Sequence, residues 1–183
     1  MSFMAAKIIS GAQTGADRAA LDWAIARGIP HGGWCPKGRK AEDGPIPAQY
    51  QVQETPSADY LQRNEWNVRD SDGTVIFTMT AELGRGSGKT AKFAAKMGRP
   101  CIHLHAGIPL EKCARALREF IEQNDIVVLN VAGSRGSNEP GVSEFVRNVL
   151  NAAFPMKYQA GEEGLIEPGT LPPCEDSPPY GTR

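Results

Sequence analysis

The sequence predicts an α/β fold with three layers, in which a mostly parallel sheet of about five strands carries helices on both faces. Two observations lead to this prediction. Short apolar runs alternate along the chain with longer segments whose apolar residues recur at helical spacing. Glycine and proline stand between these segments, where helices and strands usually end. Alternating strands and helices build right-handed βαβ units around a parallel sheet.

The expected strands are short apolar runs that end in small polar residues. In chain order they are the run Lys7-Ile8-Ile9 and residues 31–35, 73–78, 101–105 and 126–131. The segment 73–78 centres on the apolar run Val75-Ile76-Phe77, which is typical of a parallel strand that is buried on both faces.

The expected helices show apolar residues three or four positions apart. In chain order they cover residues 15–27 and 58–69, a short segment with Phe93 and Met97, residues 109–123, and a closing segment from Val142 to Leu150. Gly28 and Gly98 end the first and third of them. Ser57 is the expected N-cap of the second.

Two segments lack a clear period. Residues 36–56 contain four prolines, and a stretch of this length inside a domain is typical of a binding loop or a lid. Residues 155–183 are also proline-rich. We expect residues 1–154 to form one ligand-binding domain. The tail is either an extended arm that clasps a neighbouring subunit in a homo-oligomer, dimer or tetramer, or a frayed end.

Composition narrows the classes of partner. The chain has 183 residues, with 20 Lys and Arg against 21 Asp and Glu and a formal net charge of −1. No global charge therefore draws it to nucleic acid or to an anionic membrane. No apolar run approaches the ~20 residues of a membrane span. Its four cysteines show no C-x-x-C spacing, and we interpret them as reduced thiols of a cytoplasmic protein.

Three polar, glycine-rich loops follow predicted strands, over residues 11–18, 84–90 and 133–141. Ligands of open parallel sheets bind at the carboxyl ends of the strands. The first turn of a helix offers amides without acceptors, which bind phosphate or carboxylate. We therefore expect a phosphate-bearing small molecule at these loops, although ordinary turns with solvated charges are the alternative. The expected binding residues are Gly11, Gln13, Thr14, Gly15, Asp17, Arg18, Lys37, Arg39, Gly84, Gly86, Ser87, Gly88, Lys89, Thr90, Gly133, Ser134 and Arg135.

Other motifs are weaker. Gly86-Ser-Gly-Lys-Thr90 looks like the end of a P-loop, but Leu83 stands where that motif needs its first glycine. The first glycine loop also lacks the spacing of a classical NAD-binding turn. His103 and His105 share a strand face, where packing is favoured over metal binding because no third ligand is evident, so no metal is expected.

Four stretches carry a family resemblance. They are Gly11-Ala-Gln-Thr-Gly-Ala-Asp-Arg-Ala-Ala-Leu-Asp22, residues 28–39 with 41–44, residues 63–73, and Leu129-Asn-Val-Ala-Gly-Ser-Arg135. Over residues 6–153 the chain resembles the molybdenum (cofactor) carrier family. That family is a branch of the Rossmann-like nucleotide-binding superfamily that includes the lysine-decarboxylase-like phosphoribohydrolases.

The resemblance implies a Rossmann-like fold, a homo-oligomer and a phosphate-bearing ligand, either the molybdenum cofactor (molybdopterin) or a nucleotide. The middle loop departs from the family pattern, because Gly84-Arg-Gly-Ser-Gly-Lys-Thr90 replaces a Gly-Gly-Thr-like turn. Lys89 and Thr90 stand where the phosphoribohydrolases carry an acid. A carrier is therefore favoured over a hydrolase of nucleotide N-glycosidic bonds, for which Asp17, Glu42 and Glu65 are the candidate acids.

Overall fold

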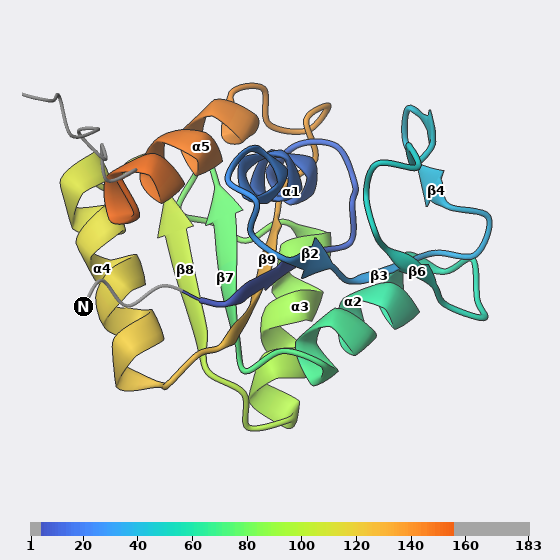
Figure 1. Cartoon of the computed structure of the whole chain (residues 1–183), viewed down its shortest axis with the longest axis horizontal. Coiled ribbons are helices and arrows are strands. Elements are labelled where there is room, and N and C mark those ends of the chain that lie inside the picture. Colours follow the sequence, from blue (N-terminus) through green and yellow to red (C-terminus); the bar gives the residue numbers. More distant parts are fainter. Residues whose placement is uncertain (1–4, 156–183) are drawn as a thin grey trace, which may run out of the picture.

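A five-stranded parallel sheet forms the centre of the computed structural model, which describes residues 5–155 (Figure 1). The strand order is β2-β1-β9-β7-β8. Ile8 in the middle of β1 pairs with His31 on one side and with Leu129 on the other. The strands are β1 (Lys7–Ile9), β2 (His31–Gly32), β7 (Gly73–Thr78), β8 (Cys101–His105) and β9 (Val128–Gly133).

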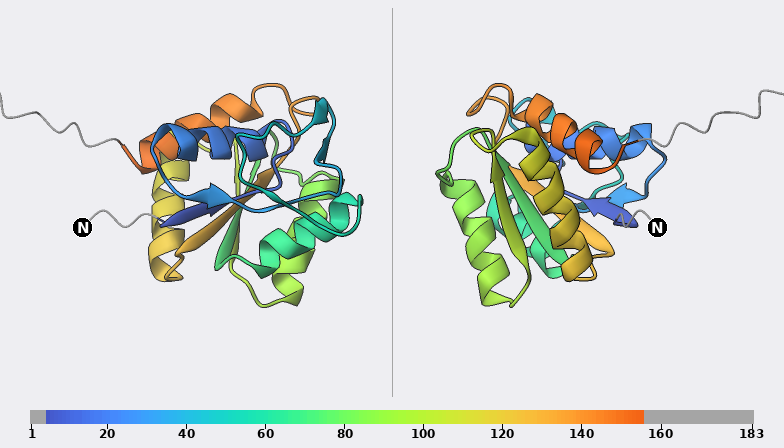
Figure 2. Two further views of the ribbon diagram at one scale, coloured as in Figure 1. Left: turned by 45° about the vertical axis from the view of Figure 1, so that its right-hand side comes forward. Right: turned by 90° about the vertical axis from the view of Figure 1, so that its left-hand side faces the viewer.

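Helices cover both faces of this sheet (Figure 2). On one face, α5 (Val142–Ala153) packs between α1 (Ala16–Ala26) and α4 (Leu110–Gln123). On the other face, α2 (Tyr60–Arg69) packs against α3 (Arg85–Lys96). The predicted three-layer, Rossmann-like α/β arrangement is confirmed.

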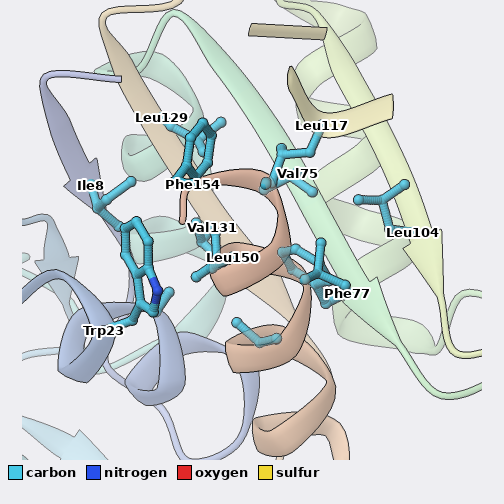
Figure 3. Close-up of a cluster of buried hydrophobic side chains, with 14 of the residues drawn as sticks. Ile8, Trp23, Val75, Phe77, Leu104, Leu117, Leu129, Val131, Leu150 and Phe154 are labelled. Carbon is cyan, nitrogen blue, oxygen red and sulfur yellow. The ribbon is translucent and has the colours of Figure 1, made fainter. Parts of the chain in front are cut away.

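The main core lies between the sheet and the α1–α5–α4 layer (Figure 3). Phe77 and Leu129 of the sheet and Leu150 of α5 are fully buried there. Trp23 of α1 packs against the ring of Phe154, with the ring centroids 6.0 Å apart. Each such side chain contributes about 1.5–3 kcal/mol through burial, which explains why the periodic apolar segments became these helices and strands.

Residues 36–56 are more ordered than the sequence predicts. They contain β4 (Lys40–Ala41), β5 (Gly44–Pro45) and β6 (Gln53–Glu54), of which β4 and β5 form a small antiparallel ladder. The guanidinium of Arg39 donates to four carbonyl oxygens of this segment, at 2.8–3.2 Å, from Ile46, Pro47, Tyr50 and Val52. Ile46, Tyr50 and Val52 are also buried in a small apolar cluster with Leu21, so the segment is ordered although its sequence shows no regular alternation of apolar residues.

The predicted second strand over 31–35 is broken at Gly33. The residues after the break form β3 (Trp34–Cys35), which pairs with β6 outside the main sheet. Gly33 has φ 120°, and a Cβ there would lie 2.2 Å from the Ser10 carbonyl oxygen. The side chain of Asn67 bonds both the amide and the carbonyl of Trp34, at 2.8 and 2.9 Å, and so takes the place of a strand neighbour.

Two helix starts also differ from the prediction. The N-cap of α2 is Asp59, whose carboxylate accepts from the Leu61 amide, whereas Ser57 accepts from the Asp59 amide instead. Helix α3 already begins at Arg85, so most of the predicted 84–90 loop is helical. Of the predicted loop, only Gly84 precedes the helix. It is the N-cap residue, and its backbone is extended.

Further sequence-based expectations concern membrane spans, the cysteine thiols and the oligomer. No helix within residues 5–155 is long and apolar enough to cross a membrane. Cys35, Cys101 and Cys113 are free thiols, and Cys35 is buried. Cys174 and nearly all of the predicted arm lie outside the described residues, so the arm and the oligomer stay predictions.

Candidate functional site

A cavity of about 260 Å³ opens at the carboxyl edge of the sheet. Its floor is the end of β9, where Ala132 and Gly133 lie between β1 and β7. Helix α1 leaves β1 toward one face of the sheet, and α3 follows β7 onto the other face. Such a reversal of direction leaves a crevice between the two connections, which is where open α/β sheets bind ligands.

The structure brings many of the predicted binding residues together around this cavity. Those that line it are Gln13, Asp17, Gly84, Gly86, Ser87, Thr90, Gly133, Ser134 and Arg135. They come from all three predicted glycine loops. The chain therefore places the first, middle and last loops at one cavity.

Other predicted binding residues lie elsewhere. Gly11 borders a much smaller cavity of about 10 Å³ next to the main one. Arg18 is paired with Asp43, and Arg39 is bonded to backbone carbonyls, so both hold the 36–56 segment in place. The remaining ones, outside the lining of the main cavity, are Thr14, Gly15, Lys37, Gly88 and Lys89.

Sequence reasoning missed the contribution of α2. Its first turns supply Tyr60, Leu61, Arg63 and Asn64 to the cavity wall. The only signal was that residues 63–73 belong to the stretches that carry the family resemblance. The other lining residues outside the list of expected binding residues are Arg85, Ala132 and Asn138.

The amino end of α1 is already used by the protein itself. The Ala16 amide donates to the Ser134 carbonyl at 3.1 Å, and the Gln13 amide donates to Asp17 at 3.2 Å. Gly15 is required here, since it has φ 83° and a Cβ would lie 2.4 Å from the Ser134 oxygen. The first helix therefore supports the cavity wall more than it offers free amides.

The amino end of α3 is open by contrast. Its N-cap, Gly84, has no side chain to accept a hydrogen bond, and the first helical bond runs from the Gly88 amide to the Gly84 carbonyl at 2.8 Å. The amides of Arg85, Gly86 and Ser87 thus have no helical acceptor. All three residues line the cavity, where the positive end of the helix dipole favours an anion.

A buried ion pair forms the back of the cavity. Arg63 Nη1 donates to Asp17 Oδ2 at 2.7 Å, and the two residues are only 9% and 4% exposed. The guanidinium passes directly over Gly11, where a Cβ would lie 1.3 Å from Nη1. Within residues 5–155, Arg63 Nε and Gln13 Nε2 are buried donors without a partner. Unpaired buried donors are costly, and both of these residues line the cavity.

Glu42 connects the 36–56 segment to two of the cavity loops. Its carboxylate accepts from the Thr14 hydroxyl and, at 2.5 Å, from the Ser137 hydroxyl. The Glu42 amide donates to Gln13 Oε1 at 3.0 Å. The bonds from Ser137 and Thr14 hold the pKa of this exposed carboxyl below its ordinary value of 4.5.

We expect Glu42→Gln to reveal this link through the pH dependence of stability. The folded-state pKa is lowered, so the bonds contribute above the ordinary glutamate pKa and are lost as pH falls through the folded value. Because Glu42 is exposed, the substitution should cost about 0.5–1 kcal/mol at pH 7. Urea unfolding between pH 7 and pH 3 should show that difference narrowing.

The control for this measurement is Glu122→Gln on the exposed side of α4. It should change the free energy of unfolding by less than about 0.5 kcal/mol at either pH. A difference in stability between the wild-type protein and the Glu42→Gln variant that stays constant with pH would contradict the assigned role of the carboxylate.

The two histidines of β8 do not belong to the cavity lining. The rings of His103 and His105 have centroids 5.6 Å apart, and His103 Nε2 lies 2.6 Å from the Thr78 hydroxyl. Burial and the neighbouring His105 lower the pKa of His103. Among the described residues, no group of three His, Cys, Asp or Glu side chains is arranged to hold a metal ion.

Comparison with known proteins shows which family the chain resembles. The model of the family described as "Circularly permutated YpsA SLOG family" matches residues 8–154. A crystal structure of a protein from Syntrophus aciditrophicus SB, named "Putative molybdenum carrier protein", is 45% identical, with a TM-score of 0.80. The similarity covers 82% of this chain and 95% of that one. No match is found among curated proteins.

These matches span the sheet, all five described helices and the cavity. The resemblance to molybdenum carriers within a Rossmann-like superfamily, predicted from the sequence, is confirmed. The chain belongs to the circularly permutated YpsA SLOG family.

Proposed function

We propose that this protein binds and carries a phosphate-bearing small molecule, either the molybdenum cofactor or a nucleotide, in the cavity at the carboxyl edge of the sheet. The observation that carries the proposal is the set of unused donors at this one place. The open amides of α3 lie there with the unpaired Arg63 Nε and Gln13 Nε2. Donors in such number favour an anionic ligand with several acceptor oxygens.

The name of the solved relative favours the molybdenum cofactor as the cargo. This cofactor is a pterin with a phosphate, so its phosphate suits the α3 amides, with Arg85 and Ser87 beside them. A nucleotide phosphate would meet the same donors. The cavity volume of about 260 Å³ is slightly below the range of roughly 300–1,000 Å³ that is typical of small-molecule sites. We therefore expect part of the ligand to extend beyond it.

The carboxylates around the cavity favour a carrier over a hydrolase. Hydrolysis of an N-glycosidic bond needs a carboxylate that is free to act as acid, base or nucleophile. Asp17, the carboxylate in the cavity lining, is bonded to Arg63 and to the Gln13 amide. Glu42 is bonded to Thr14 and Ser137, and neither Glu42 nor Glu65 belongs to the lining.

Two measurements test the carrier proposal directly. Native mass spectrometry of the purified protein, with identification of what co-purifies, should find a phosphorylated small molecule. Incubation with nucleoside monophosphates should release no free base. Turnover of these nucleotides would instead decide for the phosphoribohydrolase-like enzyme.

Arg85→Ala should weaken the binding of AMP, measured by calorimetry, by about 1–3 kcal/mol. Arg85 lies in the first turn of α3 and lines the cavity, so its guanidinium can pair with a phosphate bound at the amides. Lys89→Ala is the matched comparison, because it removes one charge one turn further along the same helix. Lys89 is exposed and outside the cavity lining, so little change is expected.

Equal losses in the two variants would contradict the assignment of the phosphate to the cavity side of α3. They would show that AMP binding depends on the overall positive charge of the helix and not on a contact with Arg85. A loss confined to Lys89→Ala would support the P-loop-like use of this stretch.

A further inference from the structure

The ring of Tyr60 lies among three cationic side chains that come from three different segments. The Arg135 guanidinium lies 4.8 Å from the ring centroid, the Lys40 ammonium 5.6 Å, and the Arg63 guanidinium 5.9 Å. Tyr60 is half-buried in the first turn of α2 and lines the cavity together with Arg63 and Arg135. Two of the three positive charges therefore lie in one wall of the proposed binding site, and the third, that of Lys40, lies beside this wall at the Tyr60 ring.

The cluster formed by Tyr60, Lys40, Arg63 and Arg135 carries more positively than negatively charged groups. Arg63 is neutralised by its ion pair with Asp17. Within residues 5–155, neither Lys40 nor Arg135 has a carboxylate oxygen within 4.0 Å. Glu42, which is near enough to Arg135 to feel its charge, accepts hydrogen bonds from Thr14 and Ser137 instead. Packing against an aromatic face offsets only part of the repulsion between such cations.

The cluster reaches the cavity through Tyr60 and Arg135, which line it, while Lys40 lies outside the lining against the Tyr60 ring; the α3 amino end is a different part of the lining. The first is built by Tyr60 of α2, Lys40 of β4 and Arg135 of the loop after β9. The second is built by the amides of residues 85–87 and the Arg85 side chain. They share no residue, and each is able to bind an anion without displacing an ion pair.

We propose that the cavity binds a ligand with two anionic groups, one at the α3 amino end and one against Lys40 and Arg135 beside Tyr60. This inference rests on the proposed function, because it assigns the second half of the same binding site. It narrows the cargo to small molecules that carry a phosphate and a further anionic group. Lys40 and Arg135 are then the residues that distinguish such molecules from simple monophosphates.

The test compares AMP with adenosine 3′,5′-bisphosphate and ADP by calorimetry on the full-length protein. At least one of the two doubly phosphorylated probes should bind about tenfold or more tightly than AMP at low salt. That preference should shrink when the salt concentration rises from about 0.05 to 0.5 M, because Lys40 is exposed.

The decisive variants are Lys40→Ala and Arg135→Gln, with Lys37→Ala as the control. Lys37 is an exposed lysine of the same segment that does not approach the Tyr60 ring. Lys40→Ala and Arg135→Gln should each abolish most of the preference for the doubly phosphorylated probe over AMP, because the second anionic group loses a partner. Lys37→Ala should preserve the preference.

Two outcomes would overturn the inference. If AMP binds with the expected dependence on Arg85 but neither bisphosphorylated probe binds more tightly, the second anion site is wrong and the proposed function stands. The second anion site is also wrong if Lys40→Ala and Lys37→Ala change the preference over AMP to the same extent. If none of the three probes binds to the wild-type protein and no phosphorylated molecule co-purifies with it, the phosphate site and with it the proposed function are contradicted. Thermal unfolding of each variant verifies that the fold is intact.

Discussion

Replacing Gly133 with alanine is expected to lower the free energy of unfolding by about 3–5 kcal/mol. Gly133 ends β9 at the floor of the cavity, next to β7 and the start of α1. A Cβ there would lie 2.2 Å from the Phe77 carbonyl oxygen and 2.6 Å from the Ala16 Cβ. Neither atom belongs to a flexible side chain, so the strand and the helix would have to separate.

Gly88→Ala is the matched control for this substitution. Gly88 lies in α3, where the nearest atom to an added Cβ would be Leu83 Cβ at 4.0 Å. Alanine should therefore stabilise the helix by about 0.5–1 kcal/mol, because it restricts the unfolded chain more than glycine does. Urea unfolding of the two variants should give changes of opposite sign. Similar changes would show that β9 and α1 are not in contact at this point.

Breaking the buried pair between Asp17 and Arg63 should have a comparable effect. Asp17→Asn keeps the shape and a hydrogen-bond acceptor for the Gln13 amide, but it leaves the Arg63 guanidinium buried without its counter-charge. Removing one partner of a buried pair typically costs about 3–5 kcal/mol. Arg63→Met should be similarly costly, since the Asp17 carboxylate is 4% exposed.

The double variant Asp17→Asn/Arg63→Met should lose clearly less than the sum of the two single losses. No unpaired charge remains in it, so the coupling free energy measures the pair itself. The control is Arg115→Met, because Arg115 and Glu119 form a pair at 3.9 Å in which both side chains are more than half exposed. That change should cost less than about 1 kcal/mol. Additive losses at Asp17 and Arg63 would contradict their direct interaction.

The pair also links stability to the proposed binding site. Arg63 lines the main cavity and the small one behind it, and its Nε has no partner within the described residues. A ligand oxygen that reached this nitrogen would satisfy a buried donor, so binding should stabilise the protein. The same residue would thus connect the fold of α2 to the proposed ligand.

Most elements could be predicted from the sequence because their signals are local. The apolar run of β7 and the helical period of α4 each lie within about fifteen residues, and both elements appear close to the predicted bounds. The strand order could not be read from such patterns. Parallel strands buried on both faces look alike, and their neighbours are fixed only when helices pack on the two sides.

The candidate site, too, has a part that the sequence predicts and a part that only the tertiary structure sets. The sequence by itself predicted that three glycine-rich segments follow strands of a parallel sheet, and this is sufficient to place them at one edge, although most of the middle segment is helical. Only the tertiary structure decided which of them offers free amides: the Ser134 carbonyl accepts from the Ala16 amide at the start of α1, whereas within residues 5–155 no side chain caps α3 at Gly84. It also decided that Arg63 reaches Asp17 across 46 positions of sequence. Ion pairs and packed rings between distant segments depend on how helices meet, and no local period encodes that.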